Sequence, residues 1–296
     1  MLGRTVCSLL TSHEVRAPAR GDLDLLDAQA VRQWFAIHRP RVVIHLAGYV
    51  RGLAANIGDQ VAGLNQNARM ALNIVEACAA YPPARLVVAG STAAYGYPYP
   101  HLPLREDDLL TGDVHAGEYG YAWGQRTLIA GTTALRRECG VDATVAVLTN
   151  LFGPDDRFHG DAAHSVPALI ARFVAAADTS TKDVHAWGSP DTTRDFMFAA
   201  DAASAIVALV DTSGAPLLVN VASGEEHTMG HVVQTIATAS GFDGTIIWND
   251  SMPVGIPRRS VDISRLSALV AMDLVSFEEG VRQTVAWYRA NRQRAR

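Results

Sequence analysis

The feature that most constrains this chain is a regular alternation of short apolar runs with longer amphipathic stretches. Runs rich in β-branched residues lie at 42–46, 86–89, 144–148 and 217–221. Stretches with apolar residues at helical spacing lie at 28–38, 67–80 and 121–138. Strands that alternate with helices pair as parallel neighbours, because each helix carries the chain back to the starting edge of the sheet. The sequence therefore predicts a fold of the α/β class, a doubly wound parallel sheet.

A second part of the chain begins after Asn150, where this alternation gives way to stretches interrupted by prolines. The prolines stand at 154, 167, 190, 216, 253 and 257. Proline interrupts helices and central strands, so we expect irregular stretches with short helices here. We predict a sheet domain at residues 1–150, completed by 195–222, and a smaller lid at 151–194 and 223–296.

The composition excludes several classes of partner. The formal net charge is −5 and no block of like charges occurs, so we expect neither a nucleic-acid surface nor a polybasic membrane patch. No apolar run reaches the ~20 residues that span a bilayer, and no leader with a cleavage site is visible, so we expect a cytoplasmic protein without a membrane segment. Cys7, Cys78 and Cys139 are odd in number and far apart, which favours reduced thiols, and we expect no metal.

The first residues place a glycine in an unusual setting. Leu2-Gly3-Arg4 reads like the end of a glycine-rich turn that enters a helix, with Gly3 as the last glycine of a G-x-x-G-x-x-G. The strand and the two glycines that should precede it are missing, although such a turn supplies the backbone N–H groups that hold a pyrophosphate. Three explanations stay open: a gene product that starts upstream, a truncated relative, or an ordinary helical glycine.

Charged residues near position 20 indicate how a dinucleotide would be recognised. Arg20 lies where the second strand of a dinucleotide fold would end, and an arginine there pairs with the 2′-phosphate of NADP, whereas an acid would bind the ribose of NAD. A solvated surface arginine is the competing interpretation. Asp24 is placed to meet the adenine edge, and Asp27 to cap the helix that starts at Ala28.

A serine and a tyrosine stand near the edge at which this kind of sheet binds its ligands. Ser91 follows the run at 86–89, and open α/β sheets bind at the carboxyl ends of their strands. A serine there can hydrogen-bond a carbonyl or hydroxyl group of a sugar, although serine and glycine are also common turn residues. Tyr121 opens a helical stretch, and Gln125 lies four residues on, on the same helix face.

Longer motifs carry a resemblance to a known family. Ser91 and Tyr121 look like the serine and the Y-x-x-x-K of the extended short-chain dehydrogenase/reductases in the NAD-dependent epimerase/dehydratase family, and residues 149–154 resemble their T-N-L-Y-G-P segment. More specific motifs resemble the GDP-L-fucose synthases, and they lie at 157–159, 164–173, 187–189, 194–196, 255–259 and 277–288. The similarity covers essentially the whole chain in one order.

This resemblance implies a Rossmann-type fold whose sheet domain binds the dinucleotide, NADP rather than NAD, and whose lid binds a nucleotide sugar. The family converts GDP-4-keto-6-deoxy-mannose to GDP-fucose by epimerising the two carbons beside the ketone and then reducing it. The resemblance also implies a homodimer through the helices at 67–80 and 121–138. It gives Ser91, Tyr121, Gln125 and His164 as catalytic residues. Cofactor contacts are expected from Gly3, Arg20, Asp24, Leu25, Ala47, Gly48, Asn65, Tyr121 and Gln125, and substrate contacts from Asn150, Arg172, Trp187, Arg194 and Arg258.

Three departures from the family pattern bear on the chemistry. The first strand is missing, Gln125 replaces the catalytic lysine, and Ala93 replaces the cysteine that serves epimerisation beside the histidine matched by His164. Gln125 keeps a hydrogen bond but not the charge that lowers the pKa of the tyrosine, and Arg126 lies about 100° further round the helix, poorly placed to replace it. Reduction tolerates the loss better than oxidation, because a neutral phenol can still give its proton to the forming alkoxide.

Three functions follow as alternatives. The leading one is an NADP-dependent epimerase/reductase on a GDP-linked 4-keto-6-deoxyhexose, in which Ser91 holds the ketone, Tyr121 exchanges the proton at its oxygen and His164 serves epimerisation. The second is a redox-neutral epimerase of an intact nucleotide sugar, which would consume no net NADPH. The third is a catalytically degenerate protein that binds a nucleotide sugar, which the three departures motivate and the retained site residues argue against.

Overall fold

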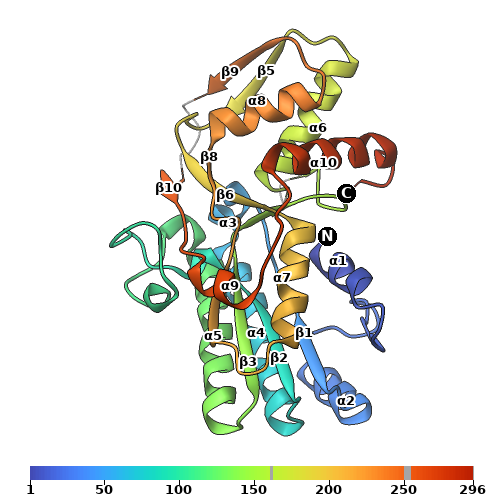
Figure 1. Ribbon diagram of the computed structural model, residues 1–296, viewed down its shortest axis with the longest axis vertical. Coiled ribbons are helices and arrows are strands. Elements are labelled where there is room, and N and C mark those ends of the chain that lie inside the picture. Colours follow the sequence, from blue (N-terminus) through green and yellow to red (C-terminus); the bar gives the residue numbers. More distant parts are fainter. Residues whose placement is uncertain (161–162, 250–254, 296) are drawn as a thin grey trace.

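The computed structural model describes residues 1–160, 163–249 and 255–295, and its centre is a parallel sheet. The sheet has the order β1-β2-β3-β7, and all three neighbouring pairs run parallel. Its strands are β1 (Val42–His45), β2 (Arg85–Ser91), β3 (Asp142–Leu148) and β7 (Leu218–Val221). The predicted α/β class is confirmed, and each strand falls within a residue or two of the expected run (Figure 1).

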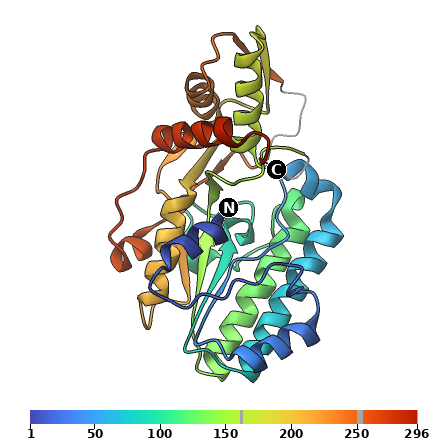
Figure 2. The same ribbon diagram turned by 90° about the vertical axis from the view of Figure 1, so that its right-hand side faces the viewer.

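Helices cover both faces of this sheet because successive strand residues point to opposite sides. Leu86 and Val88 of β2 pack in one core, whereas Val87 between them packs in another. The first core joins the sheet to helices α2 (Ala28–His38), α4 (Gln60–Ala80) and α5 (Tyr119–Glu138). The second joins it to α1 (Leu2–Leu9), α7 (Ala199–Asp211) and α9 (Ser264–Leu269). The result is a three-layer arrangement of helices, sheet and helices (Figures 1 and 2).

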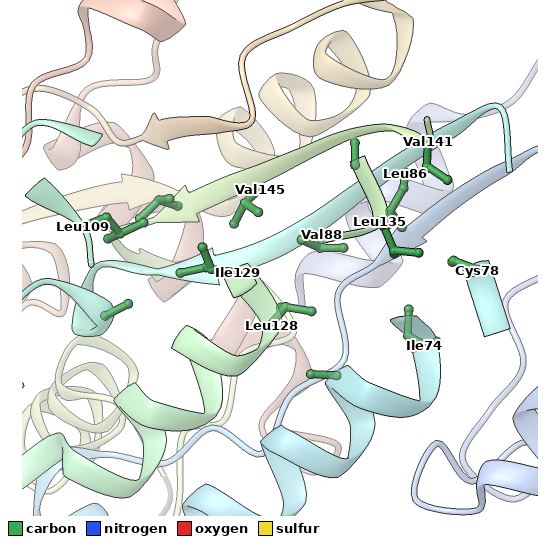
Figure 3. Close-up of a cluster of buried hydrophobic side chains, with 14 of the residues drawn as sticks. Ile74, Cys78, Leu86, Val88, Leu109, Leu128, Ile129, Leu135, Val141 and Val145 are labelled. Atoms are coloured by element: carbon green, nitrogen blue, oxygen red, sulfur yellow. The ribbon is translucent and has the colours of Figure 1, made fainter. Parts of the chain in front are cut away.

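The first core is built from aliphatic side chains on the inner faces of α4 and α5. Figure 3 shows them directed at the sheet, with Ile74 from α4, Leu128 and Ile129 from α5, and Leu86, Val88 and Val145 from the strands. The side chains that this close-up labels are fully or almost fully buried. This packing fixes the position of α5, the helix that contains Tyr121, relative to the carboxyl end of β2.

The part after Asn150 has more regular structure than its prolines indicate, so the expectation of irregular stretches with short helices is wrong there. Its strands are β4 (Asn150–Phe152), β5 (Asp183–Trp187), β6 (Thr193–Phe198), β8 (Glu226–Thr228), β9 (Thr245–Asn249) and β10 (Arg258–Arg259). Its longer helices are α6 (Ser165–Asp178), α8 (Met229–Ala239) and α10 (Phe277–Asn291), and they enclose a third core with Phe152, Phe173 and Phe198. Pro154 stands in a turn, and Pro253 lies outside the described residues.

The N-terminal region differs from the expectation in one respect. Residues 10–27, all of which the structure describes, contain no strand, so Arg20 does not follow a second strand as predicted. Instead β1 pairs directly with β2, from Val42 beside Arg85 to His45 beside Val88. The other edge of β1 has no neighbouring strand in the described part of the chain. Asp27 does cap α2 as predicted, because its Oδ1 accepts the Ala30 N–H at 3.0 Å.

Some features outside the sheet complete the description. Short helices follow β1 at α3 (Leu53–Gly58) and β2 at η1 (Thr92–Ala94), and two more lie at η2 (Glu106–Asp108) and η3 (Ala116–Glu118). Cys7, Cys78 and Cys139 are free thiols. None of the helices within the described ranges is long and apolar enough to cross a membrane.

Candidate active site

Ser91 and Tyr121 meet at the carboxyl end of β2. Ser91 is the last residue of the strand, and its Oγ accepts the Ala93 N–H at 3.2 Å, which starts η1. The side chains of Ser91 and Tyr121 are close enough to interact. Burial raises the pKa of the Tyr121 phenol above its ordinary value, and the interaction with the Ser91 side chain opposes that rise. The phenol is therefore neutral and able to donate a proton at neutral pH.

Glycines set the position of Tyr121 by allowing α4 and α5 to touch. A Cβ on Gly120 would lie 1.9 Å from the Gln60 carbonyl oxygen, and one on Gly124 would lie 2.6 Å from the Asn67 Cβ. Gln60 also accepts the Gly120 N–H through its side-chain Oε1 at 2.6 Å. Only residues without a side chain permit this approach, so the sequence around Tyr121 fixes the spacing of the two helices.

Gln125 lies one helical turn after Tyr121 and is buried. Its Oε1 has no hydrogen-bond partner among the described residues. Arg126 does not replace the missing lysine, because its guanidinium donates to the carbonyl oxygens of Ala94 at 2.9 Å, Gly112 at 2.8 Å and Thr111 at 3.2 Å. Gln125 thus leaves an unused acceptor beside Tyr121 and no charge.

Ala93 stands in an apolar setting where the family pattern would place a cysteine. It is buried in a small cluster with Val114 and Ala122, and Tyr121 packs against the same cluster. None of these four residues except Tyr121 can exchange a proton. Apart from Tyr121, this cluster therefore offers no acid or base for epimerisation.

His164 lies at the N-terminal end of α6 as its N-cap residue and is half-buried. Asp156, in the turn after β4, is close enough to His164 for the two to interact electrostatically. Burial raises the pKa of Asp156, and the charge of His164 opposes the rise. Oδ1 of Asp156 accepts the Arg157 N–H at 2.8 Å, whereas Oδ2 is buried and has no partner within the described residues.

A large cavity runs along the free edge of β1. Its volume is about 1400 Å³, and its walls come from α1, residues 13–26, α2, β1 and the loop after β1. Six of the nine predicted cofactor residues line it, namely Gly3, Arg20, Asp24, Leu25, Ala47 and Gly48. Asn65 lines a neighbouring hollow of about 470 Å³ that shares Leu26 and Gln66 with the cavity. Tyr121 and Gln125 line neither.

The cavity lining and the buried acceptor each provide groups that a dinucleotide needs. In the cavity, Arg20 provides a charge for a phosphate and Gly48 presents backbone without a side chain. Outside the cavity, the orphaned Gln125 Oε1 is an acceptor for a hydroxyl group. The glycine-rich turn is represented by Gly3 alone, which lies inside α1 with nothing within 4 Å of an added Cβ.

The predicted substrate residues fall into two groups. Arg172 and Trp187 are together, because the Arg172 guanidinium lies 5.2 Å from the Trp187 ring centroid and donates to the His185 carbonyl oxygen at 2.5 Å. Asn150 and Arg194 lie on the paired strands β4 and β6, where the Asn150 side-chain amide donates to the Asp195 carbonyl oxygen at 2.9 Å. Arg258 belongs to neither group. Its side chain is 57% exposed and makes two 2.7 Å hydrogen bonds to Glu226.

The sequence reasoning missed the neighbour of Arg258. Arg259 is buried, and it donates to the Tyr99 hydroxyl at 2.6 Å and to Glu118 Oε2 at 2.5 Å. Burial and the like charge of Arg259 lower the pKa of Arg194 to about 10, so the two arginines are close. Arg258 and Arg259 are adjacent residues of β10 and point to opposite sides of the strand. One of these two arginines had to face inward, but the sequence does not say which.

Glu118 connects the close pair of Arg194 and Arg259 to Tyr121. It immediately precedes α5, three residues before Tyr121, and its charge and that of Arg259 both act on Tyr121. Burial alone would raise the pKa of Glu118, but Arg259 lowers it below the ordinary value, so the carboxyl is ionised. Two arginines and one carboxylate leave a net positive charge beside Tyr121, which suits an anionic substrate.

Known proteins share both the sequence and the fold. The chain is 30% identical over 292 residues to the GDP-L-colitose synthase of Yersinia pseudotuberculosis, covering 97% of this chain and 94% of that protein. It is 32% identical over 289 residues to the GDP-L-fucose synthase of Escherichia coli (strain K12), covering 94% and 89%. The crystal structure of a GDP-L-fucose synthetase from Naegleria fowleri bound to NADP matches with a TM-score of 0.88 and 26% identity, covering 100% of this chain and 92% of the other.

The family itself is shown by a match over most of the chain. The model of the NAD dependent epimerase/dehydratase family matches residues 1–222, which include the sheet, Ser91, Tyr121 and Gln125. The sequence resemblance had predicted this family from the serine, the tyrosine and the segment at 149–154. The chain belongs to the NAD dependent epimerase/dehydratase family.

Proposed function

We propose that this protein is an NADP-dependent enzyme that reduces, and at one or two carbons epimerises, a GDP-linked 4-keto-6-deoxyhexose. The observation that carries the proposal is the proximity of Ser91 to a neutral Tyr121 beside a cluster of arginines. The relatives named GDP-L-fucose synthase and GDP-L-colitose synthase, and the NADP-bound neighbour, support the choice of nucleotide and cofactor.

NADPH, when bound, supplies the hydride for the ketone. The residues Gly3, Arg20, Asp24, Leu25, Ala47, Gly48 and Asn65 would hold its adenosine half, and Gln125 and Tyr121 its nicotinamide ribose. Ser91 then donates a hydrogen bond to the ketone oxygen, and Tyr121 gives its proton to that oxygen as negative charge develops. Because burial raises the pKa of Tyr121, the phenol keeps its proton at neutral pH and can act as the acid of reduction. The phenolate that would act as the base of oxidation is scarce. The protonation state of Tyr121 therefore disfavours the redox-neutral epimerase.

For the substrate half we propose that Arg194 and Arg259 hold the diphosphate, with Arg172, Trp187 and Asn150 further along the same side. Arg258 is paired with Glu226, so we assign it a smaller role in substrate binding than the resemblance implied. His164 would move the proton of epimerisation, since an imidazole can both accept and donate a proton. The division of labour between the sheet domain at 1–150 with 195–222 and the remaining residues is part of this proposal.

The test is a pair of assays on the purified chain in deuterated water. A chemically prepared GDP-4-keto-6-deoxy-mannose is supplied with NADPH, and the products are examined by NMR. We expect NADPH consumption in proportion to sugar reduced, and deuterium beside the former ketone that His164→Ala abolishes. Deuterium exchange or sugar inversion without net NADPH consumption would establish the redox-neutral epimerase. Binding of the sugar nucleotide without any turnover would establish the degenerate binding protein.

We further propose a homodimer through α4 and α5, which lie side by side (Figure 2). Their outer surface has exposed large apolar side chains, with Val61 74% exposed, and Leu64, Leu72, Tyr119 and Trp123 on the same two helices. Sedimentation of the wild type should give the mass of two chains, and Val61→Asp should give that of one. The cytoplasmic location stays a prediction.

A further inference from the structure

Tyr49, in the loop after β1, is held at both of its backbone groups by one buried side chain. Its N–H donates to the Asn67 Oδ1 at 2.9 Å, and its carbonyl oxygen accepts from the Asn67 Nδ2 at 3.0 Å. The same Nδ2 donates to the Gly63 carbonyl oxygen at 2.7 Å, which fixes Asn67 within α4. A loop residue clamped in this way cannot drift from the end of β1.

The side chain of Tyr49 is fixed as well. Its hydroxyl donates to Asp59 Oδ2 at 2.6 Å and accepts from Arg51 Nη1 at 2.9 Å. The same Arg51 nitrogen donates to Asp59 Oδ2 at 2.5 Å, and the guanidinium lies 5.6 Å from the Tyr49 ring centroid. The hydrogen bond to Asp59 raises the pKa of Tyr49, so the phenol keeps its proton and the contact persists across the neutral range. The ring is thus set before any ligand arrives.

The neighbours of Tyr49 indicate which part of a dinucleotide it would contact. Tyr49 lines the large cavity together with Gly48 and Gln66. Its partner Asp59 lines the neighbouring hollow, and the two spaces share Leu26 and Gln66. Leu26 follows Leu25, an expected cofactor contact, and Asp24, the residue expected to meet the adenine edge. Tyr49 and the turn at residues 24–26 therefore line the same cavity, at the adenosine end of the proposed cofactor site.

We propose that the ring of Tyr49 is a preorganised stacking surface for the adenine of the dinucleotide, a role that rests on the proposed function. Every base has a flat face that stacks on an aromatic ring, and a ring fixed in advance loses little freedom on binding. The hydroxyl is committed to Asp59 and Arg51, so it is the ring that meets the ligand. Asn67, Asp59 and Arg51 are positioning residues for this ring.

The experiment measures binding and not turnover, by calorimetric titration of three ligands into the free protein. Adenosine 2′,5′-bisphosphate represents the adenosine half, nicotinamide mononucleotide the other half, and NADPH the whole. Tyr49→Leu removes the ring and Tyr49→Phe removes only the hydroxyl. We expect Tyr49→Leu to lose about tenfold or more in affinity for adenosine 2′,5′-bisphosphate and for NADPH, with nicotinamide mononucleotide unaffected, and Tyr49→Phe to stay within about threefold of the wild type.

Wild-type affinity of Tyr49→Leu for adenosine 2′,5′-bisphosphate overturns the proposal. So does an equal loss in Tyr49→Phe, which would assign the effect to the hydroxyl and its ion pair. If Tyr49→Leu fails to fold, Tyr49→Trp takes its place: its added emission must be quenched by adenosine 2′,5′-bisphosphate, and unquenched emission overturns the stacking. A wild type that binds none of the three ligands contradicts the proposed function instead, so the two failures are distinguishable.

Discussion

The two sides of the central sheet are built differently. Around β2 and β3 the strands lie between two helical layers, and Leu86, Val88 and Val145 are completely buried. At the other side β1 has strand β2 on one edge and the 1400 Å³ cavity on the other, and Val42 is 38% exposed. Ser91 and Tyr121 belong to the packed side, whereas most of the expected cofactor residues belong to the open side.

This difference indicates that the two halves of the site acquire their geometry by different means. Packing holds Ser91 and Tyr121 in place whether or not a ligand is present, because close helix contact leaves them no room to move. At the β1 edge a cavity takes the place of a neighbouring strand, so the order of the loop after β1 depends more on local hydrogen bonds such as those of Tyr49 and on bound ligand. Variants on the two sides should therefore respond differently.

The largest effect is expected from Tyr121→Phe, which separates chemistry on the packed side from binding on the open side. Loss of the proton donor should lower the rate of ketone reduction about 10²- to 10⁴-fold. The phenyl ring keeps the packing and only one proposed contact to the nicotinamide ribose is lost, so affinity for NADPH should fall by no more than about tenfold. Single-turnover NADPH oxidation and a binding titration check the two parts. Reduction within tenfold of the wild type would remove Tyr121 from the role of acid.

The next effect concerns His45 at the end of β1, which burial keeps neutral by lowering its pKa to about 4. A histidine with a folded pKa below its unfolded value contributes stability above pH 6.5 and loses it as pH falls toward 4. Over that window the loss reaches about 3 kcal/mol, from 1.36 kcal/mol per unit. Urea unfolding between pH 7 and 4 measures it, with His45→Gln as control.

The difference in stability between the wild type and His45→Gln measures the contribution of His45 alone, because other groups titrate in the same pH window. Asp195 acts in the opposite direction: burial raises its pKa to about 6, so its contribution is present in acid and is lost as pH rises through 6. Both proteins contain Asp195, and it cancels in the difference. An identical decline of stability in wild type and His45→Gln would show that the histidine is solvated, and that the open side reaches further into β1 than the structure shows.

How far the sequence predicts this molecule follows the same division. The strand at 86–89 and the helix at 28–38 were found because apolar periodicity reports burial, and burial is what forms them. Residues 10–27 contain no strand, and β1 pairs directly with β2. Both features depend on which strands lie beside β1 in the fold, and a local sequence pattern does not contain that information. Arg259, Glu118 and Tyr99 were missed because they are far apart in sequence and meet only in the fold.

A pair of glycine substitutions compares the two sides directly. Gly120→Ala would put a Cβ 1.9 Å from the Gln60 backbone oxygen, so α4 and α5 must separate, at about 2 kcal/mol of stability. Gly3→Ala on the open side meets nothing within 4 Å and lies in α1, so it should stabilise by about 0.5–1 kcal/mol. Denaturant unfolding of both proteins provides the measurement. Equal effects of the same sign would contradict the contrast between a packed and an open side.

The smallest effect is expected from Gln125, which belongs to the packed side but has a side-chain oxygen that a ligand could satisfy. Its buried Oε1 has no partner in the described part of the structure, and an unsatisfied buried acceptor costs about 1–3 kcal/mol. Gln125→Met removes that acceptor at nearly constant volume, so the free protein should gain about 1 kcal/mol of stability. If the oxygen is kept for the nicotinamide ribose, the same substitution should weaken NADPH binding about fivefold. A higher melting temperature together with weaker NADPH binding would indicate that Gln125 is a binding group. A more stable variant with unchanged affinity would mean that the amide does not contact the cofactor.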